Sequence, residues 1–290
     1  MSQKELGIVG VGLLGSAMAE RCLQAGFAVY GCDVEERQRT HLTNVGGTAC
    51  KSAGEVFDRC SRVLLSLPTT DVVKTILEEV APNLRERHTI IDTTTGEPDE
   101  VAALGERLKG RGVQYIDATV SGSSDHARQG KVVIMAGGDA VVFEACRDVF
   151  DTFSQNAFHV GPCGSGTRMK LVTNLVLGLH RAVLAEGLTF AEVMGLDGNA
   201  ALECLRAGIA YSRTMDTKGE KMLNGDFLPP QARLSQHLKD VRLILAAGEQ
   251  CGQSLPLSEL HRKLLETAET AGYGDADNSA VIRAFESLRK

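Results

Sequence analysis

The sequence has no tryptophan, no block of basic residues and no uninterrupted apolar stretch of 18 residues. Since the formal net charge is −6 and no basic block offsets it, the composition argues against a nucleic-acid partner. Because a membrane span needs about 18 or more apolar residues in a row, we expect no membrane-spanning segment. The sequence also lacks internal repeats and low-complexity segments, which is typical of a globular protein.

No pair of cysteines has the CxxC spacing of zinc sites and redox dithiols. The eight cysteines are scattered along the chain, at positions 22, 32, 50, 60, 146, 163, 204 and 251. The seven histidines show no ligand spacing either, so we predict no metal site. Without a signal peptide, the cysteines are expected to be reduced thiols of a cytoplasmic protein.

What is present is a glycine turn in a specific context near the N-terminus. A short apolar strand at 6–9 leads directly into GVGLLG at 10–15, and a helix is expected from about 13 to 25. The next strand, at 27–31, ends close to Asp33, which lies 18 residues past the third glycine. Strand, glycine turn, helix and a following acidic residue form the pattern that binds dinucleotides.

Each residue of this pattern has a physical role in holding a dinucleotide. Gly10 permits a tight turn, Gly12 lets a pyrophosphate approach the backbone, and Gly15 lets helix and strand pack closely. The helix that follows directs amide donors and the positive end of its dipole at the phosphates. Asp33 can accept hydrogen bonds from both ribose hydroxyls and would repel a 2′-phosphate. The pattern therefore predicts NAD as the cofactor, with NADP as the second option.

Strands and helices alternate over the first 160 or so residues, which predicts a parallel sheet covered by helices on both faces. Further strands are expected at 62–67, 88–92, 113–117, 131–136 and 157–160, and further helices at 71–80, 98–109 and 141–150. Ligands of such sheets bind at the carboxyl ends of the strands. The cofactor residues predicted at that edge are Gly10, Gly12, Leu13, Leu14, Gly15, Asp33, Leu67, Pro68 and Thr95.

Beyond about residue 160, only helical patterns remain. A long apolar helix is expected from about 165 to 194, followed by helices near 198–209, 214–223, 231–251, 256–270 and 278–289. We therefore predict an α/β dinucleotide-binding domain at 1–162 and an all-α substrate and dimerisation domain at 163–290. One chain offers too few partners to cover the long apolar helix, so we expect a homodimer or homotetramer.

The long helix carries a cation and an amide near its beginning. Lys170 and Asn174 are four residues apart, so they point from the same face of the helix, one turn from each other. A lysine at the first buried turn of an apolar helix is costly unless it has a function. The alternative is that Lys170 extends its ammonium to solvent, as most lysines do.

Several stretches together resemble a known family over essentially the whole chain. They are GIVGVGLLGSAMAERCLQAG, DATVSGSSDHARQGKVVIMAGG, GSGTRMKLVTN, HLKDVRLILAA and AGYGDADNSA. The chain resembles the β-hydroxyacid dehydrogenases, the group that includes 3-hydroxyisobutyrate dehydrogenase and tartronate semialdehyde reductase. The resemblance implies a Rossmann-type doubly wound domain followed by an all-α domain, which the chain enters through the long interdomain helix.

Matched position by position, the resemblance implies roles for individual residues. Lys170 corresponds to the catalytic lysine, which acts as acid and base, and Asn174 corresponds to its conserved asparagine partner. Residues implied to contact the substrate or the cofactor are Ser121, Gly122 and Ser123 of the substrate loop, Thr95 at the nicotinamide ribose, and Lys239 over the cofactor. The implied reaction is hydride transfer between a nicotinamide and the hydroxyl carbon of a short 3-hydroxy acid, or reduction of the matching semialdehyde.

The chain departs from the family pattern at three places. Thr119 replaces the proline of the substrate loop, Ser123 replaces its second glycine, and Thr173 replaces the first of two paired asparagines. The loop is therefore more polar than usual, which leaves the substrate open among hydroxyisobutyrate, glycerate, hydroxybutyrate, serine and sulfolactate-like acids.

Other interpretations stay open from the sequence. The same architecture occurs in imine reductases and in non-catalytic nucleotide-binding scaffolds, and an intact Lys170 counts against both. Lys239 and Asp240 can also be read as a solvated helix pair. His126 is either a substrate contact or a surface residue of the loop, and Arg168 faces either an anionic substrate or solvent.

Overall fold

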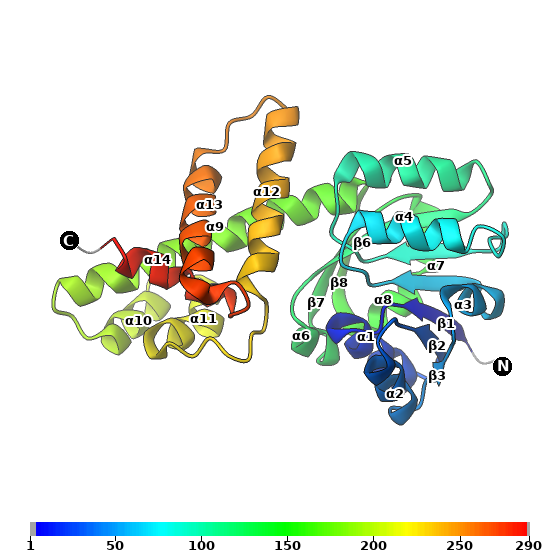
Figure 1. Cartoon of the computed structure of the whole chain (residues 1–290), viewed down its shortest axis with the longest axis horizontal. Coiled ribbons are helices and arrows are strands. Elements are labelled where there is room, and N and C mark those ends of the chain that lie inside the picture. Colours follow the sequence, from blue (N-terminus) through cyan, green and yellow to red (C-terminus); the bar gives the residue numbers. More distant parts are fainter. Residues whose placement is uncertain (1–3, 289–290) are drawn as a thin grey trace. The chain divides into compact units, whose positions relative to one another are not determined.

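The computed structural model describes residues 4–288 and divides into two compact units, Met1–Lys170 and Leu171–Lys290. The division falls inside one long helix, α9 (Ser165–Val193), which confirms the predicted helix at 165–194 almost to the residue (Figure 1). The first unit is built on a sheet and the second from helices, so the predicted class, an α/β domain followed by an all-α domain, is confirmed. The assignment of 1–162 and 163–290 as functional domains stays a prediction.

An eight-stranded sheet forms the centre of the first unit, with the order β3-β2-β1-β4-β5-β6-β7-β8. Its strands are β1 (Glu5–Val9), β2 (Ala28–Cys32), β3 (Thr48–Ala49), β4 (Arg62–Leu65), β5 (Thr89–Asp92), β6 (Gln114–Ser121), β7 (Val132–Gly137) and β8 (Ser154–Gly161). The first six strands pair in parallel, so their carboxyl ends lie at one edge.

Helices cover both faces of this sheet because successive apolar side chains of its strands point to opposite faces. Leu64 points into a core that includes residues of α1, whereas its neighbours Val63 and Leu65 point into a second core with residues of α3, α4 and α5. The helices of this unit are α1 (Leu13–Gln24), α2 (Glu36–Asn44), α3 (Ala53–Arg59), α4 (Thr70–Glu79), α5 (Pro98–Lys109), α6 (Ser124–Arg128), α7 (Ala140–Ala145) and α8 (Arg147–Phe153).

The predicted all-parallel sheet is wrong at one pair, because β7 runs antiparallel to β6. The connection between them holds only the five-residue helix α6, and a parallel crossover needs a dozen or more residues. Further differences are local, among them α6, which was not predicted, and the helix expected at 278–289, which is the 3₁₀ turn 278–281 followed by α14 (Ile282–Glu286). The helix expected at 141–150 is split into α7 and α8, and α2, β3 and α3 were not anticipated between residues 34 and 61.

The second unit consists of the remainder of α9 and the helices that follow it. These are α10 (Gly198–Ala207), α11 (Arg213–Asn224), α12 (Leu234–Gln250), α13 (Pro256–Ala268), a π-helical turn (Glu269–Tyr273), a 3₁₀ turn (Asn278–Val281) and α14 (Ile282–Glu286). Its core contains Leu184 and Leu188 of α9 with Leu238 of α12 and Leu265 of α13. The unit therefore packs α9 against the two helices α12 and α13.

A buried ion pair ties the C-terminal part of this unit together. The ammonium of Lys218 on α11 donates to both carboxylate oxygens of Asp277, at 2.8 and 2.9 Å. Asp277 is fully buried and also accepts from the backbone amides of Gln231 and Ser279. Through these contacts, Asp277 of the AGYGDADNSA stretch connects α11, the segment just before α12 and the 3₁₀ turn.

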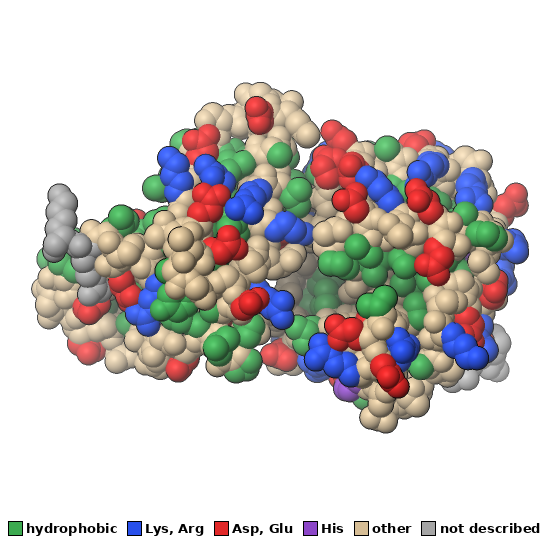
Figure 2. All heavy atoms as spheres, in the orientation of Figure 1, with side chains coloured by type: hydrophobic (Ala, Val, Ile, Leu, Met, Phe, Trp, Pro, Cys, Tyr) green, Lys and Arg blue, Asp and Glu red, His purple; other side chains and the backbone are tan. Residues whose placement is uncertain are grey.

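Helix α9 is long and apolar enough to cross a membrane by length and composition, which the sequence analysis did not expect. In the structure, 44% of its most apolar 18-residue window is buried inside the protein, and a core helix passes the same test. Side chains of both charges alternate over the visible surface (Figure 2). The helix alone is thus weak evidence for a membrane span.

Candidate active site

The three glycines of the turn between β1 and α1 meet different surroundings. Gly10 has a φ of +88°, and a β-carbon there would lie 2.3 Å from the carbonyl oxygen of Ser66. A β-carbon at Gly15 would lie 2.0 Å from the carbonyl oxygen of Gly10, whereas one at Gly12 would have no atom within 4 Å. Gly10 and Gly15 are therefore required by the turn itself, and Gly12 leaves open space against the backbone.

This open space lies at the start of α1, where a phosphate can be held. Gly12 is the N-cap of α1 and supplies no side-chain acceptor to the first amides of the helix. Leu13 is 74% exposed and Leu14 is partly buried at this helix start. The residues present thus fit the pyrophosphate of a dinucleotide, which would accept from the amides at the helix N-terminus.

Asp33 follows β2 and reaches back to the glycine turn. Its Oδ2 accepts the amide of Val11 at 2.9 Å, and its Oδ1 accepts the amide of Glu35 at 2.9 Å. Each carboxylate oxygen has a second lone pair, so Asp33 can still accept from ribose hydroxyls. The nearby Arg39 donates to the backbone oxygen of Asp33, and Arg37 pairs with Glu35.

The ends of β4 and β5 are tied to each other at the same edge. Leu67 is half-buried and donates its amide to the hydroxyl of Thr94 at 3.3 Å, and Pro68 is exposed beside it. Asp92 holds this segment by accepting the amide of Thr94 at 2.9 Å. Thr95 follows Thr94 in the chain and is half-buried.

A buried carboxylate connects β6 to the start of α9. Asp117 accepts the amide of Gly164 at 2.8 Å, the amide of Thr167 at 2.7 Å and the hydroxyl of Thr167 at 3.1 Å. Burial raises the pKa of Asp117 to about 6, although these hydrogen bonds act in the opposite direction. Asp117 thus anchors the first turn of the helix that carries Lys170.

Two further bonds continue this connection along β6. The hydroxyl of Thr119 donates to the carbonyl oxygen of Gly166 at 2.9 Å, a bond that a proline at this position could not make. The half-buried Lys170 donates from its ammonium to the carbonyl oxygen of Val120 at 2.7 Å. The ammonium therefore lies at the end of β6, directly before Ser121.

In the substrate loop that follows β6, Ser123 and His126 form hydrogen bonds with each other. Ser121 is half-buried, and Gly122 is exposed with a φ of +144°, where a side chain would be strained. Ser123 and His126 form a capping box at the start of α6, in which the amide of Ser123 donates to the imidazole Nδ1 at 3.2 Å. The Ser123 amide is therefore engaged within the loop.

Asn174 and Lys239 belong to the second unit and lie beside one carboxylate. Asn174 is 6% exposed, and its Nδ2 donates to Oδ2 of Asp240 at 2.9 Å. The ammonium of Lys239 lies 3.5 Å from Oδ1 of the same Asp240. Arg168, by contrast, forms an exposed ion pair with Asp99 at 2.7 Å.

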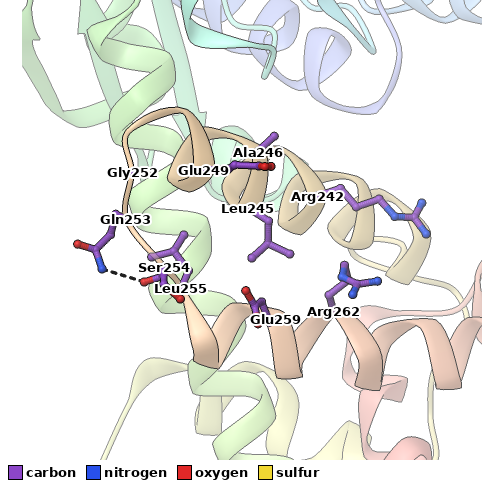
Figure 3. Close-up of a pocket in the computed structure, with 10 residues that line it drawn as sticks. All are labelled: Arg242, Leu245, Ala246, Glu249, Gly252, Gln253, Ser254, Leu255, Glu259 and Arg262. Carbon is purple, nitrogen blue, oxygen red and sulfur yellow. Dashed lines mark hydrogen bonds between the residues drawn. The ribbon is translucent and has the colours of Figure 1, made fainter.

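A groove of about 730 Å³ lies between α12 and α13 in the second unit (Figure 3). It is lined by Arg242, Leu245, Ala246, Glu249, Gly252, Gln253, Ser254, Leu255, Glu259 and Arg262. None of the residues predicted for the active site is among these. Within residues 4–288, the structure holds no group of three or more histidine, cysteine and acidic side chains arranged to bind a metal.

Three residues that organise this site, Asp117, Thr119 and Asp240, were not predicted as site residues from the sequence. Asp117 and Thr119 occur in the quoted DATVSG stretch, and Asp240 follows Lys239 in the quoted HLKD stretch. A carboxylate placed on a central strand was the available signal for Asp117, because a buried acid needs partners. Asp240 could not be connected to Asn174 from the sequence, since 66 residues separate them.

The sheet edge with its glycine turn and Asp33 has the arrangement of a dinucleotide-binding protein. Two family models match the chain in the same order. Residues 5–161 match the NAD binding domain of 6-phosphogluconate dehydrogenase, and residues 164–285 match the NAD-binding model of NADP-dependent 3-hydroxyisobutyrate dehydrogenase. The chain belongs to the β-hydroxyacid dehydrogenase family, as predicted, and uses NAD(P).

Individual relatives agree with this membership. Glyoxylate/succinic semialdehyde reductase 1 of Arabidopsis thaliana is 30% identical over 99% of this chain and 100% of its own length. The structure of 3-hydroxyisobutyrate dehydrogenase from Salmonella typhimurium is 25% identical, with a TM-score of 0.89 over 97% of this chain and 99% of that chain. An imine reductase from Pseudomonas sp. is 19% identical, with a TM-score of 0.65 over 98% of this chain and 100% of that chain, which shows a shared fold alone. The chain is an NAD(P)-dependent oxidoreductase of hydroxy acids.

Proposed function

We propose that the enzyme transfers a hydride between a nicotinamide cofactor and the hydroxyl-bearing carbon of a short 3-hydroxy acid, or reduces the matching semialdehyde. The observation that carries this proposal is the position of Lys170, whose ammonium bonds to Val120 at the end of β6. The substrate loop begins at the next residue, Ser121. The cofactor supplies the hydride acceptor or donor, and the protein supplies binding, orientation and proton transfer.

Each predicted residue has a task in this reaction. Lys170 stabilises charge on the substrate oxygen, donates a proton to it during reduction and accepts one during oxidation. Asn174, one turn further along α9, holds the same oxygen or the lysine. Ser121 and the amide of Gly122 bind the carboxylate, with Ser123 contributing its amide only if His126 releases it. Lys239 covers the cofactor.

Two other functions share the architecture. An imine reductase acts on a carbon–nitrogen double bond, and a nucleotide-binding scaffold performs no reaction. The placed ammonium of Lys170 favours hydroxy acid chemistry, because a proton must move to and from an oxygen. A screen of 3-hydroxyisobutyrate, glycerate, 3-hydroxybutyrate, serine and 3-sulfolactate with NAD and NADP, and of cyclic imines with NADH and NADPH, separates these functions. The absorbance of the reduced cofactor measures turnover in both cases. Turnover of cyclic imines without turnover of any hydroxy acid would contradict the proposal.

The cofactor preference in that screen is expected to be NAD. A 2′-phosphate beside Asp33 would meet charge repulsion, and Arg37 and Arg39 are engaged by Glu35 and by backbone oxygens. We expect kcat/KM to be about tenfold or more higher with NAD than with NADP, since 1.4 kcal/mol corresponds to tenfold. Asp33→Ser should reduce this difference by raising kcat/KM with NADP. Equal kcat/KM with both cofactors in the wild-type enzyme would show that the carboxylate of Asp33 does not discriminate between NAD and NADP.

We also propose that residues 1–162 bind the dinucleotide and residues 163–290 contribute to the substrate site and to assembly, in a cytoplasmic enzyme. All eight cysteines are unpaired in the structure, which supports a reducing compartment. Among the described residues of the second unit, α9 exposes apolar side chains at a spacing of seven, namely Val176, Val183 and Phe190. This spacing places them on one face of the helix, so a second copy is the expected cover.

The expected assembly is a homodimer or a homotetramer. Val183 is 66% exposed and Phe190 is 63% exposed in the single chain. Replacing both by glutamate should yield a monomer, because two desolvated charges per chain oppose association. Light scattering at micromolar concentration measures the mass of both proteins, and Glu186→Gln on the same helix is the control. A wild-type protein that is monomeric under these conditions would refute the expectation.

A further inference from the structure

The hydrogen bond between Asn174 and Asp240 joins two buried side chains of α9 and α12. The Nδ2 to Oδ2 distance is 2.9 Å, and the two residues are 6% and 8% exposed. A buried charged acceptor makes such a bond stronger than one between neutral groups. The pair therefore has the geometry to hold the Asn174 side chain in one orientation.

The chemistry of the pair determines which end of the amide faces Asp240. An ionised carboxylate only accepts hydrogen bonds, so the atom of Asn174 that faces it must be the donor Nδ2. The carbonyl Oδ1 of Asn174 is then directed elsewhere. Arg181 lies two turns further along the same face of α9 and supports the charged carboxylate. Burial lowers the pKa of Arg181 to about 10, against the carboxylates of Asp277 and Asp240, so it stays cationic at neutral pH.

A glycine allows α12 to approach α9 closely enough for this bond. Gly178 lies one turn after Asn174, and a β-carbon there would lie 2.6 Å from Nε2 of His237 and 2.7 Å from Cε1 of His261. His237 is three residues before Asp240, which places both on one face of α12. The close approach at Gly178 thus brings the carboxylate of Asp240 to Asn174.

We propose that Asp240 is a positioning residue that orients the amide of Asn174, so that Oδ1 and not Nδ2 is offered to the reacting groups. This inference rests on the proposed function, in which Lys170 and Asn174 serve one substrate oxygen. Asn174 then acts as a hydrogen-bond acceptor for Lys170, both for the neutral amine that takes the hydroxyl proton during oxidation and for the ammonium that gives a proton during reduction. A donor at this place would compete with Lys170 for the oxygen lone pairs.

Exchanging the two side chains tests this orientation. Asp240→Asn preserves volume but lets either amide rotate, so we expect kcat to fall about tenfold while KM for the hydroxy acid changes little. Asn174→Asp places two carboxylates against each other and should lower kcat further, by about 10². The double variant Asn174→Asp/Asp240→Asn restores the bond with reversed polarity and still offers an oxygen. Its kcat should recover to within about tenfold of the wild type.

The assays use the full-length enzyme with NAD and the hydroxy acid that the screen shows to be turned over fastest. A double variant no better than Asn174→Asp would overturn the proposal, because Asn174 would then act through its donor. An unchanged kcat in Asp240→Asn would overturn it as well, and this isosteric variant decides the matter if the double variant does not fold. Failure of the proposed function is seen separately, as activity retained in Lys170→Ala.

A matched pair of glycine variants checks the geometry without altering either partner. Gly178→Ala should separate α9 from α12 and lower kcat about tenfold, since small misplacements of catalytic groups are costly. Gly187→Ala lies on the same helix, where a β-carbon meets no atom within 4 Å, and should leave kcat unchanged. A folded Gly178→Ala enzyme with full kcat would contradict the proposed role of the close helix approach.

Discussion

Replacing Lys170 by alanine is expected to lower kcat by about 10² to 10⁴, the range typical of a positioned acid–base group. The ammonium donates to Val120 at the entrance of the substrate loop, so its loss removes both charge stabilisation and the proton donor. The Kd for NAD should hardly change, because the phosphate site proposed at Gly12 does not include Lys170. Stopped-flow or steady-state kinetics and calorimetric cofactor binding measure the two quantities.

Three controls separate this chemical role from a structural one. Lys170→Arg keeps the charge but should not restore turnover, since a guanidinium does not release its proton near neutral pH. Added ethylamine should partly rescue Lys170→Ala by supplying the missing amine. Lys239→Ala should instead weaken cofactor binding and affect kcat less. If Lys170→Ala keeps most of its activity, the lysine is structural and the acid–base group lies elsewhere.

Alanine substitutions at two positions of the glycine turn, Gly12 and Gly15, should affect different properties. Gly15→Ala should mainly lower the stability of the fold, and Gly12→Ala should mainly weaken the binding of NAD. Gly15→Ala should destabilise the fold by about 3 kcal/mol, because its β-carbon would lie 2.0 Å from a backbone oxygen that cannot move freely. Gly12→Ala should change stability by no more than about 0.5 kcal/mol, since nothing lies within 4 Å.

The affinity for NAD, in contrast to stability, should be more sensitive to the substitution at Gly12 than to the one at Gly15. The methyl group of Gly12→Ala occupies the space expected for the pyrophosphate, so we expect the Kd for NAD to rise about 10- to 100-fold. Thermal unfolding with and without NAD, together with calorimetric titration, measures stability and affinity in the same samples. A Gly12→Ala protein that binds NAD as tightly as the wild type would show that the pyrophosphate does not lie over Gly12.

Much of the fold could be predicted because its signals are local. The glycine turn with Asp33, the alternation of strands and helices, and the apolar helix at 165–194 each depend on residues close in the sequence. The antiparallel direction of β7 could not be predicted from such local patterns, because strand direction depends on the length and path of the connection from β6. Helices α2 and α3 have short, polar or mixed patterns, which carry little periodic signal.

The sequence was sufficient to predict the family, the class of cofactor, and the separation of a sheet-based half from a helical half. It also singled out Lys170 and Asn174, because an amide and a cation one turn apart stand out in an apolar helix. The distant groups that contact this part of α9 could be identified only from the packing of separate elements. Val120, Asp117 and Asp240 lie 50, 50 and 66 residues from the groups they contact, at Lys170, Thr167 and Asn174. Such contacts arise when separate elements pack together, and no local spacing encodes them.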